Sequence, residues 1–253
     1  MATAIPAVAL VTGASRGIGR VIAQKLAADG VRVAVNFRQD LAAANETLAS
    51  LPGPGHALFQ ADVSDSAACV ALIAAVQKAY GRIDVLVNNA GLYEEHDPRL
   101  AAFSEWEQAW QRAIAANLTG PAHLAFLAAQ LMRAAGAGRI VNITSRGAFR
   151  GEPTAPGYGA AKAGLNSFGQ SLARALAPDQ IGVFTVAPGW VATDMARTHL
   201  AGPSGAEIFA QHPLGRVATP EEVATTVAWL ALDAPLAMTG CIIDLNGASY
   251  LRT

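Results

Sequence analysis

The sequence predicts an α/β protein in which helices cover both faces of a doubly wound parallel sheet. Two observations carry this prediction. Short runs rich in β-branched residues alternate along the chain with longer, alanine-rich segments of helical character. Several of the short runs are continuously apolar, as expected for strands that are covered on both faces. Strands that alternate with helices form right-handed βαβ units, and such units build a parallel sheet.

The predicted elements follow one another with no internal repeat and no linker. Strands are expected at residues 8–12, 31–37, 57–60, 85–88, 139–144, 181–187 and 241–245. Helices are expected between them, near residues 18–29, 41–50, 67–80, 103–135, 158–176 and 220–232.

Local signals mark some boundaries of these elements. Ser64 is predicted to begin the third helix, with Asp65 as an acidic residue in its first turn. Gly30 and Gly81 occupy positions typical of glycines at helix C-termini. The least regular stretch is 192–218, which contains several glycine and proline residues. Because loops of this length inside a compact domain are usually lids or binding segments, we expect a substrate lid there.

Composition excludes several classes of protein. The chain has 253 residues, of which 52% are hydrophobic and 15% charged, and this excludes intrinsic disorder. A formal net charge of −1 provides no basic surface, so we expect no nucleic-acid partner. Cys69 and Cys241 lie outside any CxxC pattern and the five histidines show no metal-ligand spacing, so no metal is expected.

The N-terminal region and the hydropathy favour a cytoplasmic protein. No basic residue precedes Arg16, so the charged region of a signal peptide is missing. No apolar run reaches the ~20 residues of a membrane span, and no membrane association is expected.

A glycine-rich turn follows the first predicted strand and opens the first helix. Its spacing, from Gly13 through Gly17 to Gly19, is GxxxGxG. Glycines let the backbone approach a pyrophosphate closely, and the positive end of the following helix attracts the anion. The turn lies where a doubly wound sheet binds dinucleotides, although a glycine-rich turn alone is weak evidence.

The residues after the second strand bear on the type of dinucleotide. An acidic residue there would bond the ribose 2′-hydroxyl and indicate NAD. This chain has no acid until Asp40, whereas Arg38 and Arg16 could pair with a 2′-phosphate. We therefore expect NADP(H), with NAD(H) as the alternative.

A serine, a tyrosine and a lysine form the candidate catalytic set. Ser145 follows the fifth predicted strand, and Tyr158 and Lys162 stand four positions apart on one helix face. A positive charge beside the phenol is predicted to lower the pKa of Tyr158. A tyrosine tuned in this way exchanges a proton with a carbonyl or alcohol oxygen, which Ser145 could hold.

With these motifs in order, the whole chain resembles the short-chain dehydrogenase/reductase family. The resemblance implies a single Rossmann-type domain over residues 1–253, a seven-stranded sheet, and hydride transfer between a nicotinamide and a carbonyl/alcohol pair. The residues that carry it are Thr12-Gly-Ala-Ser-Arg-Gly-Ile-Gly19, Asp62-Val63, Asn88-Asn-Ala-Gly91, Asn117, Ser145, Tyr158-x-x-x-Lys162 and Pro188-Gly189.

The resemblance also implies a role for each matching position. Tyr158 would be the general acid in reduction, Lys162 would tune it and bond the nicotinamide ribose, and Ser145 would orient the carbonyl. Asn117 would hold a water that links Lys162 to solvent. The set expected at the cofactor is Gly13, Ser15, Arg16, Gly17, Ile18, Gly19, Arg38, Asp62, Val63, Asn89, Ala90, Gly91, Tyr158, Lys162, Pro188, Gly189, Val191 and Thr193.

The substrate is less well defined. The run from Tyr158 to Gly164 is similar to the β-ketoacyl-acyl-carrier-protein reductase branch of the family, whose carrier-docking positions are basic. Gly136 and Asp179 occupy those positions here, so we expect a general carbonyl reductase or alcohol dehydrogenase and disfavour a carrier-bound substrate. A NAD-dependent sugar or alcohol dehydrogenase and a non-catalytic dinucleotide-binding regulator are the alternatives. Arg146, Phe149, Trp190 and Met195 are candidate pocket walls.

The family is usually tetrameric, which the resemblance extends to this chain. The alanine-rich predicted helices at 103–135 and 158–176 have apolar faces suited to contacts between subunits. We expect a homotetramer that acts on a small-molecule substrate.

Overall fold

The computed structural model describes residues 7–252 and shows one seven-stranded sheet with the order β3-β2-β1-β4-β5-β6-β7. Every strand pair is parallel. The predicted fold class is therefore confirmed. The strands are β1 (Val8–Val11), β2 (Arg32–Phe37), β3 (Ala57–Gln60), β4 (Val85–Asn88), β5 (Gly138–Ile143), β6 (Ile181–Pro188) and β7 (Ile242–Leu245).

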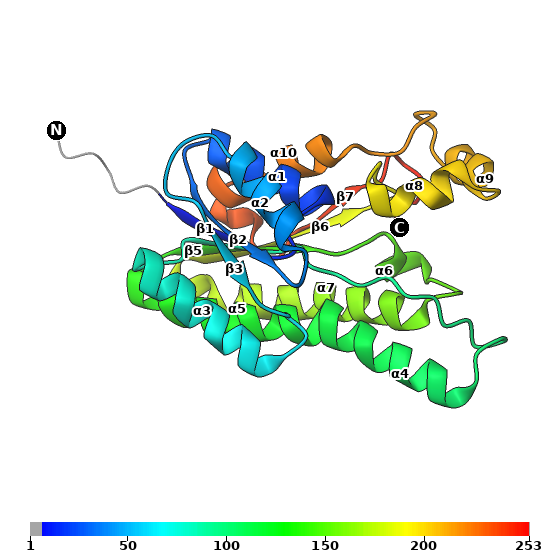
Figure 1. Ribbon diagram of the computed structural model, residues 1–253, viewed down its shortest axis with the longest axis horizontal. Coiled ribbons are helices and arrows are strands. Elements are labelled where there is room, and N and C mark those ends of the chain that lie inside the picture. The colour runs from blue at the N-terminus through cyan, green and yellow to red at the C-terminus, as the bar shows by residue number, and fades with distance from the viewer. Residues whose placement is uncertain (1–6, 253) are drawn as a thin grey trace.

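Helices cover both faces of the sheet (Figure 1). On one face lie α1 (Gly17–Ala28), α2 (Leu41–Ser50) and α10 (Pro220–Leu232). On the other lie α3 (Ser66–Tyr80), α5 (Gly120–Ala135) and α7 (Pro156–Leu176). Each face has its own apolar core, because alternate side chains of a strand point to opposite sides. In β1, Ala9 and Val11 belong to the first core, and Val8 and Leu10 to the second.

The chain reverses its winding direction between β1 and β4, which are neighbours in the sheet. The loops after these strands therefore diverge, and such a point at the carboxyl edge of a parallel sheet is where ligands bind. The glycine-rich turn follows β1, and Asn89, Ala90 and Gly91 follow β4. The fold thus brings both segments to the same edge.

The long helix predicted at 103–135 is interrupted. Its parts are α4 (Phe103–Ile114), a π-helical turn at Ala115–Thr119, and α5. The extra residue of a π-turn shifts the helical register, and such turns are frequent at functional sites. Gly120 begins α5 with its Cα against the carbonyl oxygen of Val63, which leaves no space for a β-carbon.

The segment predicted to be irregular, 192–218, contains two short helices. These are α8 (Asp194–Ala201) and α9 (Gly205–Ala210), which lie beyond the carboxyl edge of the sheet in Figure 1. Thr193 caps α8 by accepting a hydrogen bond from the Ala196 amide. The remaining helical turns are α6 (Gly147–Arg150), Ala177–Asp179 and Leu236–Met238.

The predicted role of Ser64 as a helix start is wrong. Asp65 is the N-cap of α3, and its carboxylate accepts a hydrogen bond from the Ala68 amide at 2.9 Å. The Ser64 hydroxyl donates instead to Asp62. Gly81 ends α3 with a φ of 74°, as predicted for a helix C-terminal glycine.

Two further properties concern the described residues as a whole. Over residues 7–252, none of the helices combines the length and the apolar character needed to cross a membrane. Within the same range, no group of three or more His, Cys, Asp or Glu side chains is arranged to hold a metal ion.

Candidate active site

The glycine-rich turn is held against the neighbouring strands by side chains of Thr12, Asn36 and Asn89. The Thr12 hydroxyl accepts hydrogen bonds from the backbone amides of Asn89 and Ala90 at 2.9 and 3.0 Å. The Asn89 side chain donates to the Thr12 carbonyl at 2.8 Å, and the Asn36 side chain accepts from the Gly13 amide at 3.2 Å. The ends of β1, β2 and β4 therefore fix the backbone of the turn.

Glycine is required at two positions of this turn. Gly13 has a φ of +61°, and a β-carbon there would lie 2.9 Å from Cα of Ala90. At Gly19 a β-carbon would overlap the Gly13 carbonyl oxygen and lie 2.5 Å from the side-chain nitrogen of Asn89. The turn is thus packed so closely that any side chain would force it away from β4.

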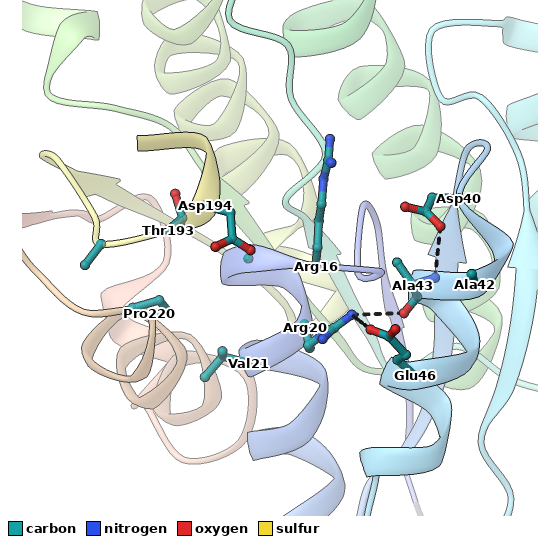
Figure 2. A pocket seen from close by; sticks show the side chains of 12 residues that line it. Arg16, Arg20, Val21, Asp40, Ala42, Ala43, Glu46, Thr193, Asp194 and Pro220 are labelled. Atoms are coloured by element: carbon teal, nitrogen blue, oxygen red, sulfur yellow. Dashed lines mark hydrogen bonds and ion pairs between the residues drawn. The ribbon is translucent and has the colours of Figure 1, made fainter. Parts of the chain in front are cut away.

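The N-terminus of α1 is suited to bind an anion. Its N-cap residue, Arg16, makes no side-chain cap, and the first turn contains no acidic residue. The first amide groups of the helix, together with the positive end of its dipole, therefore face the open edge of the sheet. A cavity of about 540 Å³ lies beside this turn. It is lined by residues of α1, α2 and the 192–194 segment, including Arg16, Gly17 and Thr193 (Figure 2).

These features fit the pyrophosphate of a dinucleotide. Arg16, which lines this cavity, adds positive charge. Its side chain is exposed and extends away from α1 in Figure 2. Arg20 is already occupied: it donates to the Ser15 carbonyl at 2.8 Å and pairs with Glu46. Ile18 packs on the core beneath, so the backbone amides and Arg16 are the groups available to an anion here.

Arg38 and Asp62 lie together at the ends of β2 and β3. The guanidinium of Arg38 is 3.9 Å from a carboxylate oxygen of Asp62, and their side chains are 58% and 42% exposed. The amide and hydroxyl of Ser64 donate to the other oxygen of Asp62. Although burial raises the pKa of Asp62, these hydrogen bonds and Arg38 bring it below its ordinary value. Val63, next to this pair, is buried.

Asn117 is held rigidly in the π-helical turn. Its amide nitrogen donates to the carbonyls of Leu92 and Ala113 at 2.8 and 2.9 Å, and its oxygen accepts from the Leu92 amide at 3.1 Å. A β-carbon on Gly91 would lie 2.9 Å from this oxygen and 3.5 Å from Nζ of Lys162. The absence of a side chain at Gly91 therefore leaves space between Asn117 and Lys162.

Lys162 lies beneath the site and is 3% exposed. Its Nζ donates to the carbonyl of Ile143 at 2.9 Å and lies 5.6 Å from the centre of the Tyr158 ring. Burial lowers the pKa of Lys162 to about 8, because the charged ammonium is removed from water.

The predicted lowering of the Tyr158 pKa is wrong for this structure. Burial raises it to about 12, a hydrogen bond with Ser145 opposes the rise, and the charge of Glu152 and the neighbouring Tyr93 add to it. Sequence spacing predicted the lysine beside the phenol but not the partial burial of the phenol. Tyr158 is therefore fully protonated at neutral pH in this environment.

Three further residues lie beside Tyr158 or the start of its helix. The ring of Tyr93 lies edge-on to that of Tyr158, with centres 5.2 Å apart. Glu152 packs on the Cα of Gly147, and burial raises the pKa of its carboxyl group. His96 contacts the beginning of α7. All three stand within loops that contain motif residues, but no spacing rule identifies them.

Arg146, one of the predicted pocket walls, is buried, with 3% exposure. It donates to Gln211 at 2.9 Å, and burial lowers its pKa to about 10. The Ser145 hydroxyl accepts a hydrogen bond from the Gly147 amide at 3.0 Å. The side chain of Met195, another predicted pocket wall, lies outside the part of the chain that the structure describes.

The segment after β6 lies close to the glycine-rich turn. Pro188 is the last residue of β6, Gly189 donates its amide to Leu245, and Val191 bridges to Ala218. A β-carbon on Gly17 would lie 3.8 Å from the Thr193 methyl group. The predicted cofactor residues from these two distant segments thus face each other.

Comparisons with known proteins agree with this arrangement. The family model described as "Enoyl-(Acyl carrier protein) reductase" matches residues 13–247. The chain is 41% identical over 247 residues to a 3-oxoacyl-acyl-carrier-protein reductase of Synechocystis sp., covering 96% of this chain and 97% of the relative. It is 38% identical over 246 residues to an acetoacetyl-CoA reductase of Rhizobium meliloti, covering 96% and 98%. A 3-oxoacyl-acyl-carrier-protein reductase of Escherichia coli is 37% identical over 244 residues, covering 96% and 97%.

Proposed function

This chain belongs to the short-chain dehydrogenase/reductase family of oxidoreductases, which use a nicotinamide cofactor, and we propose that it reduces a ketone to a secondary alcohol with NADPH. The observation that carries the proposal is the environment of Tyr158. Its phenol hydrogen-bonds with Ser145, and Nζ of Lys162 lies 5.6 Å from its ring centre. The reverse oxidation of an alcohol uses the same groups.

The preference for NADP(H) rests on charge. Arg16 and Arg38 are exposed beside the proposed cofactor site, and the carboxylate of Asp62 already has hydrogen bonds from Ser64. A 2′-phosphate offers both arginines a charge-assisted bond. With Arg38 bound to the phosphate, Asp62 remains free to accept a bond from the adenine amine.

The remaining contacts of the cofactor are proposed from the same edge of the sheet. The α1 N-terminus, with Arg16 and Gly17, would hold the pyrophosphate. The segments after β3, β4 and β6 would line the adenine, the ribose and the nicotinamide in turn. The proposed residues are Gly13, Ser15, Arg16, Gly17, Ile18, Gly19, Arg38, Asp62, Val63, Asn89, Ala90, Gly91, Tyr158, Lys162, Pro188, Gly189, Val191 and Thr193.

The chain's own residues supply the proton chemistry. When bound, the nicotinamide supplies the hydride to the carbonyl carbon. Tyr158 donates its phenolic proton to the carbonyl oxygen, and a pKa raised to about 12 keeps that proton in place at neutral pH. Ser145 holds the same oxygen and stabilises the charge that develops on it. In oxidation Tyr158 must first lose its proton.

Lys162 and Asn117 would return the proton to Tyr158. Because its pKa is lowered to about 8, the buried ammonium of Lys162 can release and regain a proton near neutral pH. The open space at Gly91, between Lys162 and Asn117, is bordered by polar groups that could hold a water. We assign these two residues to a proton relay on that basis.

The substrate is proposed to be a soluble ketone of the 3-oxoacyl type, free or as a small thioester. The named relatives act on 3-oxoacyl-carrier and acetoacetyl-CoA substrates. Docking of an acidic carrier needs exposed positive charge. Here Gly136 ends α5, and the nearby Arg133 is paired with Asp179 at 2.9 Å. A carrier-bound substrate is therefore disfavoured.

Segment 192–218 is proposed to act as the substrate lid of a single domain spanning 1–253. Its Gln211 accepts hydrogen bonds from Arg146 and Arg150, which follow the catalytic Ser145. These hydrogen bonds would connect the proposed lid to the segment after β5, which contains Ser145. We further propose that the protein forms a homotetramer and is cytoplasmic. Large apolar side chains such as Phe103 and Phe126, which are 74% and 62% exposed on α4 and α5, are suited to contacts between subunits.

A substrate panel with Tyr158→Phe as the control tests the function. NADPH absorbance should fall with acetoacetyl-CoA or a small 3-oxo ester, and more slowly with NADH. In the variant, turnover should fall about 100-fold or more while the affinity for NADPH stays within about twofold, because one general acid contributes about 10²–10⁴-fold. Retained turnover in the variant, or faster reduction of carrier-bound substrate, would contradict the respective assignment.

A further inference from the structure

His96 forms three hydrogen bonds, two of which connect the loop after β4 to the loop before α7 and to the first turn of α7. The residue is 3% exposed. Its backbone amide donates to the Thr154 carbonyl at 2.7 Å. On the ring, Nδ1 lies 2.9 Å from the Glu94 carbonyl oxygen, and Nε2 accepts from the Gly157 amide at 3.0 Å.

The partners of the ring define its protonation state. A carbonyl oxygen can only accept, so Nδ1 carries the proton that goes to Glu94. The Gly157 amide can only donate, so Nε2 is unprotonated. The imidazole of His96 is therefore neutral and uses both of its nitrogens. Trp106 lies against one side of it, with ring centres 6.2 Å apart.

The bond to Gly157 completes the first turn of α7. The N-cap residue Ala155 has no side-chain cap, and Pro156 has no amide hydrogen. The amide of Gly157 has no partner within the helix, because the first amides of a helix lack one. His96 supplies that partner from another segment. A β-carbon on Gly157 would lie 3.0 Å from Nε2, so glycine lets the ring approach this closely.

Gly157 directly precedes Tyr158. We infer that His96 is a positioning residue for the catalytic tyrosine: its Nε2 anchors the first turn of α7 and so sets the place of the Tyr158 hydroxyl. The inference rests on the proposed role of Tyr158. His96 acts through the backbone and takes no part in the proton transfer itself.

The alternative is that His96 only stabilises the loop. His56 provides a matched control, because its Nδ1 accepts from the Val33 amide and its Nε2 lies close to the Pro52 carbonyl, both at 3.0 Å. Val33 is near the beginning of β2, at the end of the sheet away from the site. Loss of His56 thus removes the same kind of bonds without affecting α7.

Two conservative variants separate the two ring nitrogens. In His96→Gln the longer side chain can place an amide oxygen near the position of Nε2 and accept from Gly157. In His96→Asn the shorter side chain can still donate to Glu94 but cannot reach Gly157. His96→Phe keeps the ring and removes both bonds. His56→Gln is the control, because the longer side chain can still reach the Pro52 carbonyl but loses the acceptor for the Val33 amide.

We expect kcat for ketone reduction to fall about 10–100-fold in His96→Asn and His96→Phe, because small displacements of a reacting group have effects of this size. His96→Gln should restore kcat to within about threefold, and Kd for NADPH should stay within about twofold in all variants. In a Tyr158→Phe background, His96→Asn should have no further effect on the residual rate.

Exchange of the Gly157 amide hydrogen measures the anchor without turnover, and so separates this inference from the proposed function. Exchange should be faster in His96→Asn than in the wild type and in His96→Gln. The inference is overturned if Gly157 exchange is unchanged in His96→Asn. It is also overturned if, in an enzyme that turns over, kcat in His96→Asn equals that of His96→Gln or falls no more than in His56→Gln. If His96→Phe does not fold, the comparison of His96→Asn with His96→Gln still tests the inference.

Discussion

The Nζ of Lys162 lies 5.6 Å from the centre of the Tyr158 ring, while its hydrogen bond goes to the carbonyl of Ile143. Lys162 is buried and Tyr158 is partly buried. Burial moves their pKa values in opposite directions, to about 12 for the phenol and about 8 for the ammonium. The pair therefore holds a proton on Tyr158 at neutral pH, with a lysine beneath it that can exchange its own.

The raised pKa of Tyr158 predicts different pH dependences for the two directions of the reaction. Reduction uses the protonated phenol, so its kcat/KM should not increase between pH 6 and 9. Oxidation needs the phenolate, so its kcat/KM should rise with pH, by up to about tenfold per unit. Rates measured with one ketone/alcohol pair check this, and an oxidation rate independent of pH over this range would contradict it.

Glu152 is predicted to oppose ionisation of Tyr158, because its charge raises the pKa of the phenol. In Glu152→Gln the pH profile of alcohol oxidation should therefore shift to lower pH, with a several-fold higher rate near pH 8. Glu95→Gln is the control, since Glu95 affects the pKa of Tyr93 and is not among the causes of the Tyr158 shift. Equal shifts in both variants would show that Glu152 has no specific role.

Replacement of Lys162 by Met should abolish turnover. It should also change how the free energy of unfolding depends on pH. Because burial lowers the pKa of Lys162 from 10.5 to about 8, the folded protein releases this proton at a lower pH than the unfolded chain. The free energy of unfolding of the wild type should therefore rise, relative to Lys162→Met, as pH increases from 8 to 10.5. The difference should reach up to about 3 kcal/mol.

Urea unfolding at pH 7.5 and 9.5 measures about 2 kcal/mol of this difference. The exposed Lys78 provides the matched substitution, Lys78→Met, whose stability relative to the wild type should stay constant between the two values. A constant difference for Lys162→Met as well would show that burial does not shift its ionisation.

Arg38 is predicted to select the cofactor. In Arg38→Ala the affinity for NADPH should fall about 10–100-fold, which corresponds to the loss of one charge-assisted bond, while that for NADH stays nearly constant. Isothermal titration with both cofactors measures this. Arg133→Ala removes a paired arginine remote from the site and should change neither affinity. An equal loss for NADPH and NADH in Arg38→Ala would argue against a 2′-phosphate contact.

Gly19 is predicted to tolerate no side chain. A β-carbon would overlap the Gly13 carbonyl oxygen, so Gly19→Ala should displace the turn, lower stability by about 1–3 kcal/mol and weaken cofactor binding. Gly30→Ala is the comparison, because nothing lies within 4 Å of its β-carbon and its cost arises from the φ of +82° alone. Cofactor affinity should be unchanged in Gly30→Ala and lower in Gly19→Ala, and equal affinities in the two variants would contradict the prediction.

Much of the fold could be predicted from local patterns. All seven strands form at the predicted runs, because apolar β-branched runs between helices leave few other solutions. Asn117 shows where such reasoning stops. The region around it was predicted as one uninterrupted helix, but its amide bonds the backbone of Leu92 from within a π-turn. Leu92 lies in the loop after β4, 25 positions away in the sequence, so the helical pattern could not predict this bond.

The sequence by itself determined the order of strands and helices, the glycine turn after β1, and the Ser145, Tyr158 and Lys162 set. These depend on neighbours along the chain and on spacing within one helix. Only the tertiary structure decided the ionisation of that set and the anchoring of its helix. The reason is that a pKa follows from burial and from charges such as Glu152, and the bond from Gly157 to His96 joins residues 61 positions apart.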